Sequence, residues 1–306
     1  MKSVNNTIRI GTQMHQKHRL LKVPRKTNHH ITLDPINRFN QVKDFAIKRM
    51  EFKLGKLIGS GSQGQVYQAM NMYTGEIVAC KKLLNHQKDQ QKLDTELSFL
   101  QILQHKNIIK YIFHESTKDS ILIYQEFMSM GSISQLIRDF GPINEQTVKR
   151  YTQQILNGLE YLHKKGILHL DLKSSNILLD CNGQVKISDF GCSRQNKENL
   201  YQSILQGSVP WMAPEVVRQE RIGPASDIWS FGCLILEMIT GRPPWSEQIN
   251  FDNPATSLLS IGLSGEYPRI PETASIEIKE LLLMCFQIDP LQRATLRKLK
   301  QSAFLQ

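Results

Sequence analysis

The sequence is poor in cysteine, and its few cysteines do not form pairs along the chain. There are five, an odd number, and no two lie close together. Disulfide frameworks and zinc modules need cysteines at short, regular spacings, so this pattern argues against both. It favours a reducing compartment, and we expect a cytoplasmic protein, with the nucleus as the alternative. The five cysteines are Cys80, Cys181, Cys192, Cys233 and Cys285.

Long hydrophobic runs are also lacking. No stretch approaches the roughly 20 apolar residues that cross a membrane. The opening residues, MKSVNNTIRIGTQ, do not contain the apolar core of a secretory signal. We therefore expect no transmembrane segment. Hydrophobic residues are 40% of the 306 and charged residues 22%, which is typical of a soluble globular protein.

Acidic residues are scarce in the first 50 positions. This segment holds 11 Lys and Arg and 2 Asp and Glu, a net charge of +9, whereas the remainder holds 27 and 26, a net charge of +1. We expect residues 1–50 to be a flexible basic tail. Its cluster KHRLLKVPRK (17–26) suits an acidic partner, an anionic surface or nuclear entry, and a merely solvated tail is the alternative.

The rest of the chain, 51–306, is patterned like a folded body. Residues 52–83 alternate apolar and polar side chains between glycine-containing turns, which predicts three antiparallel strands. Residues 90–103 carry leucines at helical spacing, which predicts an amphipathic helix. Strands before helices indicate an α+β body with two lobes, 51–127 and 128–306. Further strands are expected near 108–115 and 120–127, and further helices at 144–166, 226–241, 255–263, 274–286 and 294–304.

The segment GSGSQGQV (59–66) places three glycines between two predicted strands. Without side chains, Gly59, Gly61 and Gly64 let backbone N–H groups approach phosphates closely. Val66 would then pack on an aromatic base. A glycine-rich hairpin without a ligand is the alternative.

Lys81 and Glu96 form a predicted pair. Strand alternation points Lys81 to the same side as Ala79, and a buried ammonium needs an anionic partner. Glu96 lies on the apolar face of the predicted helix at 90–103, so we expect it to meet Lys81.

Polar residues interrupt the apolar segment HLDLKSSNILL (169–179). Asp171 and Asn176 lie on one predicted loop, and Asp189 follows a predicted strand–turn–strand that returns it close to Asn176. Carboxylate and amide oxygens are hard ligands that suit Mg²⁺ beside phosphates.

Taken in order, these segments resemble a eukaryotic protein kinase from about Phe52 to the C-terminus. The resemblance implies a two-lobed fold, with a small antiparallel β-sheet lobe carrying one helix and a larger, mainly helical lobe. The nearest resemblance is to mitogen-activated protein kinase kinase kinases, although p21-activated kinases share much of the pattern. The motifs are GSGSQGQV, VACK (78–81), Glu96, HLDLKSSN, DFG (189–191), APE (213–215), SDIWSFG (226–232) and Arg293.

The resemblance implies ATP and Mg²⁺ as cofactors and a protein, such as a MAP kinase kinase, as substrate, with no nucleic acid in the active site. It implies that Asp171 accepts the proton of the substrate hydroxyl and that Lys173 stabilises the transferring phosphoryl group. Asn176 and Asp189 would hold Mg²⁺, and Lys81, paired with Glu96, would hold the ATP phosphates. The nucleotide-binding residues it implies are Ile58, Gly59, Ser60, Gly61, Ser62, Gln63, Gly64, Val66, Ala79, Lys81, Gln125, Glu126, Met128 and Leu178.

Other residues are expected to support the site or to choose its substrate. The resemblance implies that Glu215 pairs with Arg293 and that Asp227 holds the catalytic loop. Lys173 and Ser208 match the Ser/Thr-specific pattern and disfavour a tyrosine kinase. A pseudokinase acting as a scaffold is a further alternative, disfavoured because all five central catalytic residues are present: Lys81, Glu96, Asp171, Asn176 and Asp189.

Leu170 departs from the family pattern. The family most often has Arg at this position, where it pairs with a phosphate on the activation loop. The departure removes no catalytic group, but it puts the usual mode of activation in doubt.

Overall fold

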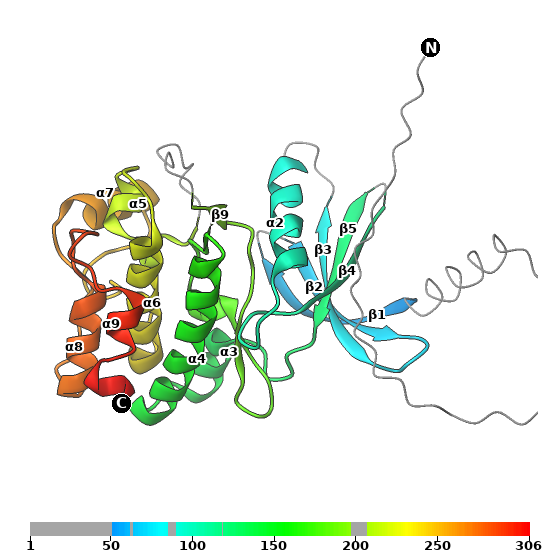
Figure 1. The fold of residues 1–306 in the computed structure, drawn as a ribbon, viewed down its shortest axis with the longest axis horizontal. Coiled ribbons are helices and arrows are strands. Elements are labelled where there is room, and N and C mark those ends of the chain that lie inside the picture. The colour runs from blue at the N-terminus through cyan, green and yellow to red at the C-terminus, as the bar shows by residue number, and fades with distance from the viewer. Residues whose placement is uncertain (1–50, 62–63, 85–89, 118, 197–206) are drawn as a thin grey trace, which may run out of the picture. The chain divides into compact units, whose positions relative to one another are not determined.

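The computed structural model describes residues 51–61, 64–84, 90–117, 119–196 and 207–306. The expected basic tail lies outside these residues. Within them, a β-rich lobe precedes a helical lobe along the chain (Figure 1). The predicted α+β class and two-lobed arrangement are confirmed.

The small lobe is a five-stranded antiparallel sheet with strand order β1-β2-β3-β5-β4. The predicted three strands, helix and two strands occur in that order. A turn after β2 begins with Asn71, whose Oδ1 accepts hydrogen bonds from the N–H groups of Tyr73 and Thr74. The elements are β1 (Phe52–Gly61), β2 (Gly64–Asn71), β3 (Ile77–Leu84), α2 (Gln90–Ile102), β4 (Tyr111–Ser116) and β5 (Ser120–Glu126).

Helix α2 packs its apolar face inward, as its leucine spacing predicts. Leu97 and Leu100 are buried in the main core, and Glu96 is buried beside them. A carboxylate on this face is costly unless it is paired, so the helix brings a charged group to the inside of the lobe for a specific contact.

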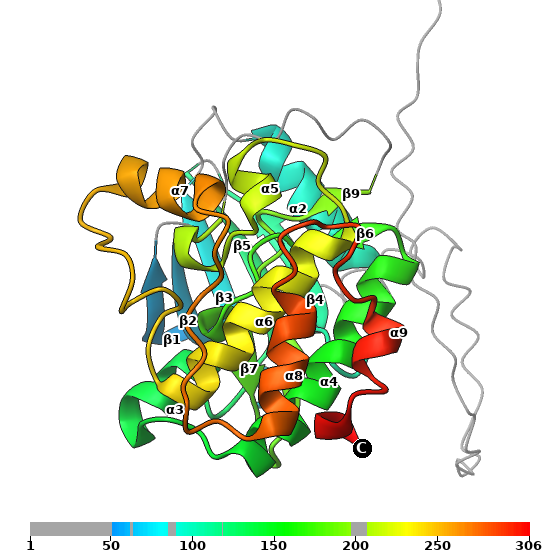
Figure 2. The ribbon, with the colours of Figure 1, turned by 90° about the vertical axis from the view of Figure 1, so that its left-hand side faces the viewer.

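The large lobe is built mainly of helices (Figure 2). The side chain of Asn144 accepts a hydrogen bond from the N–H of Thr147, and this caps the first turn of α4 as the sequence predicts. The helices are α3 (Ile133–Phe140), α4 (Glu145–Lys164), α5 (Pro214–Val217), α6 (Pro224–Thr240), α7 (Pro254–Leu263), α8 (Ile276–Cys285) and α9 (Leu296–Leu299).

Helix α6 forms the centre of this lobe. It is apolar nearly all round, and its residues from Ser226 to Met238 are buried. A Cβ built on Gly232 would lie 2.6 Å from the Cβ of Cys285, so glycine is what allows α6 and α8 to approach this closely. The core of the lobe therefore depends on this helix, which also carries Asp227.

The C-terminal helix is shorter than its pattern predicts. In place of one helix over 294–304, α9 spans four residues and a separate 3₁₀ turn covers Ala303–Leu305. Ser302 between them has an extended backbone, with φ −65° and ψ 149°, which stops the helix. Apolar spacing could not reveal this break, because residues from both pieces still reach the core.

Short strand pairs place the catalytic segments. β7 (Ile177–Leu179) and β8 (Val185–Ile187) form the predicted hairpin. β6 (Ile167–Leu168) pairs with β9 (Arg194–Gln195), which the sequence did not predict. The described helices include none with the length and apolar character needed to span a bilayer.

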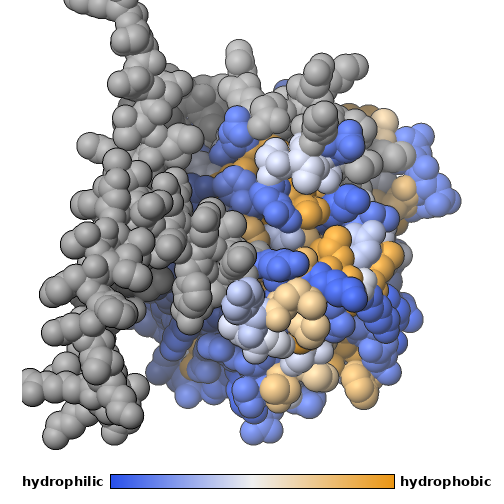
Figure 3. Space-filling view, turned by 90° about the vertical axis from the view of Figure 1, so that its right-hand side faces the viewer, coloured by the Kyte–Doolittle hydropathy of each residue, from blue (hydrophilic) through white to orange (hydrophobic). Residues whose placement is uncertain are grey.

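On the side that the small lobe occupies, hydrophobic residues are interspersed among hydrophilic ones (Figure 3). The large hydrophobic residues that are exposed on β1 to β3 and their connecting turn are Leu54, Leu57, Ile58, Met70, Met72, Tyr73 and Ile77.

Candidate active site

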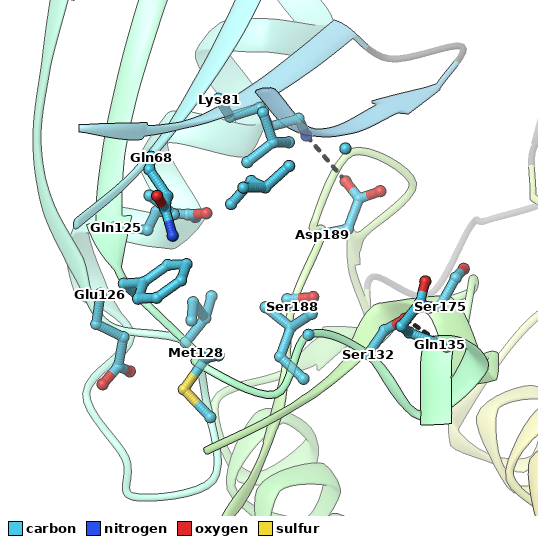
Figure 4. Close-up of a pocket in the computed structure, with 18 of the residues that line it drawn as sticks. Gln68, Lys81, Gln125, Glu126, Met128, Ser132, Gln135, Ser175, Ser188 and Asp189 are labelled. Carbon is cyan, nitrogen blue, oxygen red and sulfur yellow. Dashed lines mark hydrogen bonds and ion pairs between the residues drawn. The ribbon is translucent and has the colours of Figure 1, made fainter. Parts of the chain in front are cut away.

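A cavity of about 710 Å³ opens between the two lobes. Its roof comes from β1, β2, β3 and β5, and its floor includes residues within and on either side of the β7–β8 hairpin: Ser175, Asn176, Leu178, Ser188 and Asp189. Figure 4 shows Lys81 above and Asp189 opposite it, with Gln125 and Met128 toward the segment that links the lobes. The cavity thus gathers residues from distant parts of the sequence.

Lys81 lies at the roof of the cavity and bonds to two carboxylates. Its Nζ lies 2.8 Å from Glu96 Oε1 and 3.0 Å from Asp189 Oδ1. Burial alone lowers the pKa of Lys81, but the two negative charges outweigh burial and raise it above its usual value. The predicted Lys81–Glu96 pair is present, and the ammonium is held charged.

Asp189 occupies an uncommon backbone conformation, with φ 64°. Such strain in a residue other than glycine is typical of functional sites. Burial raises the pKa of Asp189, but the charge and hydrogen bond of Lys81 outweigh this and lower the pKa below its usual value. The residue therefore presents an ionised carboxylate to the cavity.

Asp171 is buried and receives three hydrogen bonds. Its Oδ1 accepts from the N–H of Ser208 at 2.9 Å, and its Oδ2 accepts from Lys173 Nζ at 2.9 Å and Asn176 Nδ2 at 3.0 Å. Lys173 Nζ also donates to Ser208 Oγ at 2.5 Å. Three of the predicted catalytic residues, Asp171, Lys173 and Asn176, thus form one cluster with Ser208, the residue expected to select Ser or Thr.

Asp227 on α6 positions the backbone of this loop. Its Oδ2 accepts from the N–H of His169 at 2.9 Å, and its Oδ1 accepts from the N–H of Leu170 at 2.8 Å. Burial raises the pKa of Asp227, but the bond to His163 and nearby charge lower it below its usual value. Leu170 has φ 62°, so these bonds hold a strained backbone in place.

The loop is also bound to helix α6 through Glu237. Its two carboxylate oxygens accept from the N–H and Oγ of Ser174 and from Trp211 Nε1. Burial raises the pKa of Glu237, and the bonds from Ser174 and Trp211 offset part of that rise. The sequence analysis missed this residue, although a carboxylate in a helix that is apolar nearly all round indicates a buried group that needs hydrogen-bond partners.

Asn176 and Asp189 fit the oxygen donors that Mg²⁺ requires. The side-chain Nδ2 of Asn176 donates two hydrogen bonds to Asp171, one to its backbone carbonyl and one to its carboxylate. The side-chain oxygen Oδ1 of Asn176 is then the atom able to coordinate a cation. Both residues line the same cavity. Amide and carboxylate oxygens are hard ligands of the kind that Mg²⁺ prefers beside phosphates, so this donor pair suits such a cation.

Most of the predicted nucleotide-binding residues line this cavity: Ile58, Gly59, Val66, Ala79, Lys81, Gln125, Glu126, Met128 and Leu178. Ser60, Gly61 and Gly64 are described but do not line it, and Ser62 and Gln63 lie outside the described residues.

Some cavity residues were missed by the sequence analysis, among them Gln68, Ser132 and Gln135. Gln68 follows Val66 by two positions on one strand, so alternation alone could have placed it on the same face. Ser132 caps α3 through a bond from the N–H of Gln135, and its place at the cavity depends on how the lobes pack.

The expected Glu215–Arg293 pair is present and fully buried. Two guanidinium nitrogens of Arg293 lie 2.7 and 3.0 Å from the two oxygens of Glu215. This pair lies in the large lobe between the APE segment and the chain after α8, and it plays a structural role.

The chain is similar to known kinases over most of its length. Residues 52–305 match the family model for the protein kinase domain. The chain is 39% identical to "Mitogen-activated protein kinase kinase kinase ANP1" of Arabidopsis thaliana over 84% of its residues and 40% of that protein. It is 39% identical to "MAP kinase kinase kinase mkh1" of Schizosaccharomyces pombe over 82% of its residues and 24% of that protein.

A further relative is "Mitogen-activated protein kinase kinase kinase A" of Dictyostelium discoideum, 38% identical over 84% of this chain and 28% of that protein. The chain thus spans well under half the length of these relatives. The match nevertheless covers the cavity, the catalytic loop and the supporting ion pairs. A protein kinase domain implies the use of ATP, and this chain belongs to the protein kinase family.

Proposed function

We propose that this chain is an ATP-dependent protein kinase that phosphorylates serine or threonine. The observation that carries the proposal is the bonded cluster of Asp171, Lys173 and Ser208 beside the cavity. It places a carboxylate and an ammonium next to the residue expected to line the acceptor site.

The proposed reaction transfers the γ-phosphoryl group of ATP to a hydroxyl oxygen. The oxygen–phosphorus bond forms, the bond to the β-phosphate oxygen breaks, and ADP leaves. Asp171 orients the hydroxyl and accepts its proton, while Lys173 stabilises charge on the moving group. Lys81 orients the phosphates, and Glu96 fixes the position of Lys81.

Asn176 and Asp189 would hold Mg²⁺, which when bound supplies charge neutralisation for the phosphates. The contribution of the chain itself is to hold these donors still. The bonds from Asn176 to Asp171 and from Lys81 to Asp189 do this in the structure.

The names of the relatives support a role as a MAP kinase kinase kinase, with a MAP kinase kinase as substrate. Cytoplasmic location, and binding of the basic segment 1–50 to an acidic partner or surface, remain proposals that rest on the sequence alone.

The test is a kinase assay with Mg²⁺ and ATP on a peptide array and on a purified MAP kinase kinase. An Asp189→Asn variant is the control. Phosphoserine or phosphothreonine that depends on Asp189 is the expected result. Mainly phosphotyrosine would contradict the substrate class, and no transfer in any activated state would favour a pseudokinase scaffold.

A further inference from the structure

An ion pair joins the end of strand β5 to strand β8. Lys186 Nζ is 2.8 Å from Glu126 Oε1. The same oxygen accepts a hydrogen bond from the backbone N–H of Lys110 at 2.7 Å. The carboxylate of Glu126 thus bonds both to the start of β4 and to strand β8.

The two partners belong to the two sides of the nucleotide cavity. Glu126 ends β5 and lines the cavity, while Figure 4 shows its carboxylate directed away from the cavity. Lys186 is the central residue of β8, where it pairs with the cavity residue Leu178. Three residues after Lys186 comes Asp189. The pair therefore connects the end of the cavity near Glu126 with the hairpin that leads to Asp189.

The Glu126–Lys186 pair is partly shielded from water, so its loss should have a measurable energetic effect. The side chain of Lys186 is 11% exposed and that of Glu126 is 27% exposed. Fully exposed pairs contribute little because water screens them. Removing one partner from a mostly buried pair leaves a charge without compensation, and this disfavours the arrangement that buries it.

Backbone bonds anchor β8 to the small lobe beside this pair. The N–H of Ile109 donates to the carbonyl of Ile187, and the N–H of Ile187 donates to the carbonyl of Asn107, both at 2.9 Å. Strand β8 is thus joined to the segment between α2 and β4 by its backbone. The Glu126–Lys186 pair adds a second attachment, by side chains, at the end of β5.

We propose that Lys186 is a positioning residue for nucleotide binding, acting through Glu126. The pair fixes the position of the cavity wall at Glu126 and Met128 relative to the floor at Leu178. Nucleotide binding then loses less conformational entropy, because the residues that line the cavity are already held in the binding arrangement. This inference rests on the proposed use of ATP by the cavity.

The experiment measures nucleotide affinity directly, so that it does not depend on phosphate transfer. A fluorescent ADP analogue is titrated with Mg²⁺ into the full chain and into Lys186→Met, Glu126→Gln, the double variant and Lys186→Arg. The matched control is Lys300→Met, which breaks a 2.9 Å pair with Glu160 inside the large lobe. Thermal unfolding of each variant separates misfolding from altered binding.

We expect Lys186→Met and Glu126→Gln each to weaken Kd by roughly three- to tenfold, the effect of losing a partly shielded interaction. The double variant should be no weaker than the weaker single variant, because both remove the same contact. Lys186→Arg should stay within about twofold of the unchanged protein, as should Lys300→Met. In a phosphorylation assay, KM for ATP should rise in the same ratio while KM for peptide stays constant.

Kd values within about twofold for both single variants would overturn the proposal. So would losses that multiply in the double variant, because the two residues would then act independently. If the unchanged protein bound the analogue but transferred no phosphate, the proposed kinase activity would fail while the positioning role could still be judged from Kd.

Discussion

Two buried ion pairs in this molecule have similar chemistry and different surroundings. Arg293 and Glu215 are 0% and 1% exposed, and each has further partners: Arg293 donates to the carbonyls of Ala225 and Gln287, and Glu215 accepts from Ser226. Lys81, in contrast, faces a cavity and bonds to two carboxylates.

The difference shows how the same kind of contact can serve stability or chemistry. The donors and acceptors of Arg293 and Glu215 are used within the protein, and the ring of Trp229 packs 5.2 Å from the guanidinium. Such a pair can only hold segments together. Lys81 is shared between Glu96 and Asp189 at the edge of an open space, where an anionic ligand can also reach it. The comparison predicts that breaking the Arg293–Glu215 pair mainly lowers stability, whereas removing Lys81 mainly lowers activity.

The largest expected effect is on stability. Arg293→Met leaves the carboxylate of Glu215 buried without its partner, which should lower the free energy of unfolding by about 3–5 kcal/mol. Urea unfolding at neutral pH measures it. The control is Arg269→Met, because Arg269 is exposed and lies 4.0 Å from Glu247, and it should cost less than about 0.5 kcal/mol. A loss below about 1 kcal/mol for Arg293→Met would contradict the structural role assigned to the pair.

The second prediction concerns activity. Lys81→Met should lower kcat/KM by roughly two to three orders of magnitude, because an oriented positive charge on the phosphates is lost. Unfolding should change less than in Arg293→Met, since Asp189, one of the two carboxylates left behind, is 24% exposed and can be solvated by water in the cavity. Glu96→Gln should reduce activity less, because Lys81 could still reach the phosphates. Near-normal turnover in Lys81→Met would show that another group holds them.

The third prediction is a pH dependence at Asp189. Its pKa in the folded protein is below the usual 3.8, so ionisation contributes stability above the unfolded pKa, and this is lost as the pH falls through the folded pKa. Wild-type protein should therefore exceed Asp189→Asn in unfolding free energy by about 1–2 kcal/mol at neutral pH. The difference should shrink in acid, below the usual pKa. Unfolding curves at several pH values test this, and a difference that grew in acid would have the wrong sign.

Local periodicity made much of the site predictable. Strand alternation placed Lys81 inside, and helix spacing placed Glu96 on the buried face, so the two could be paired from 15 residues apart in sequence. The hairpin after Asn176 likewise predicted where Asp189 returns. These inferences succeeded because each depends on one regular element and its period.

What the sequence did not reveal depends on packing between elements. Glu126 at the end of β5 and Lys186 in β8 meet through the packing of the two lobes, and no spacing along the chain encodes that contact. The positive φ of Leu170 is imposed by bonds to Asp227, which lies 57 residues later. The break before the last 3₁₀ turn likewise reflects the backbone at Ser302, which its apolar neighbours do not disclose.

Leu170 marks a place where an ion pair of the usual family pattern is lacking. A leucine cannot donate a hydrogen bond to a phosphate on the activation loop, and its side chain packs against the main core while Asp227 holds its backbone. The catalytic cluster, including the bond from Lys173 to Ser208, is formed without that contact. Control should therefore depend less on loop phosphorylation than is usual, and more on partners or on the position of α2.

The smallest expected effect follows from this. Phosphatase-treated protein should keep a substantial fraction of its activity, with a loss of less than about threefold. The reason is that Leu170 cannot form the ion pair with a loop phosphate that an arginine would form at this position. Ser203→Ala, at a residue outside the described segments, should be similarly mild. Ser208→Ala should be severe, because it removes the hydroxyl bonded to Lys173. Peptide phosphorylation rates measure all three. If dephosphorylation or Ser203→Ala abolished activity, another basic residue such as Arg194 would replace the missing arginine, and Leu170 would be a neutral substitution.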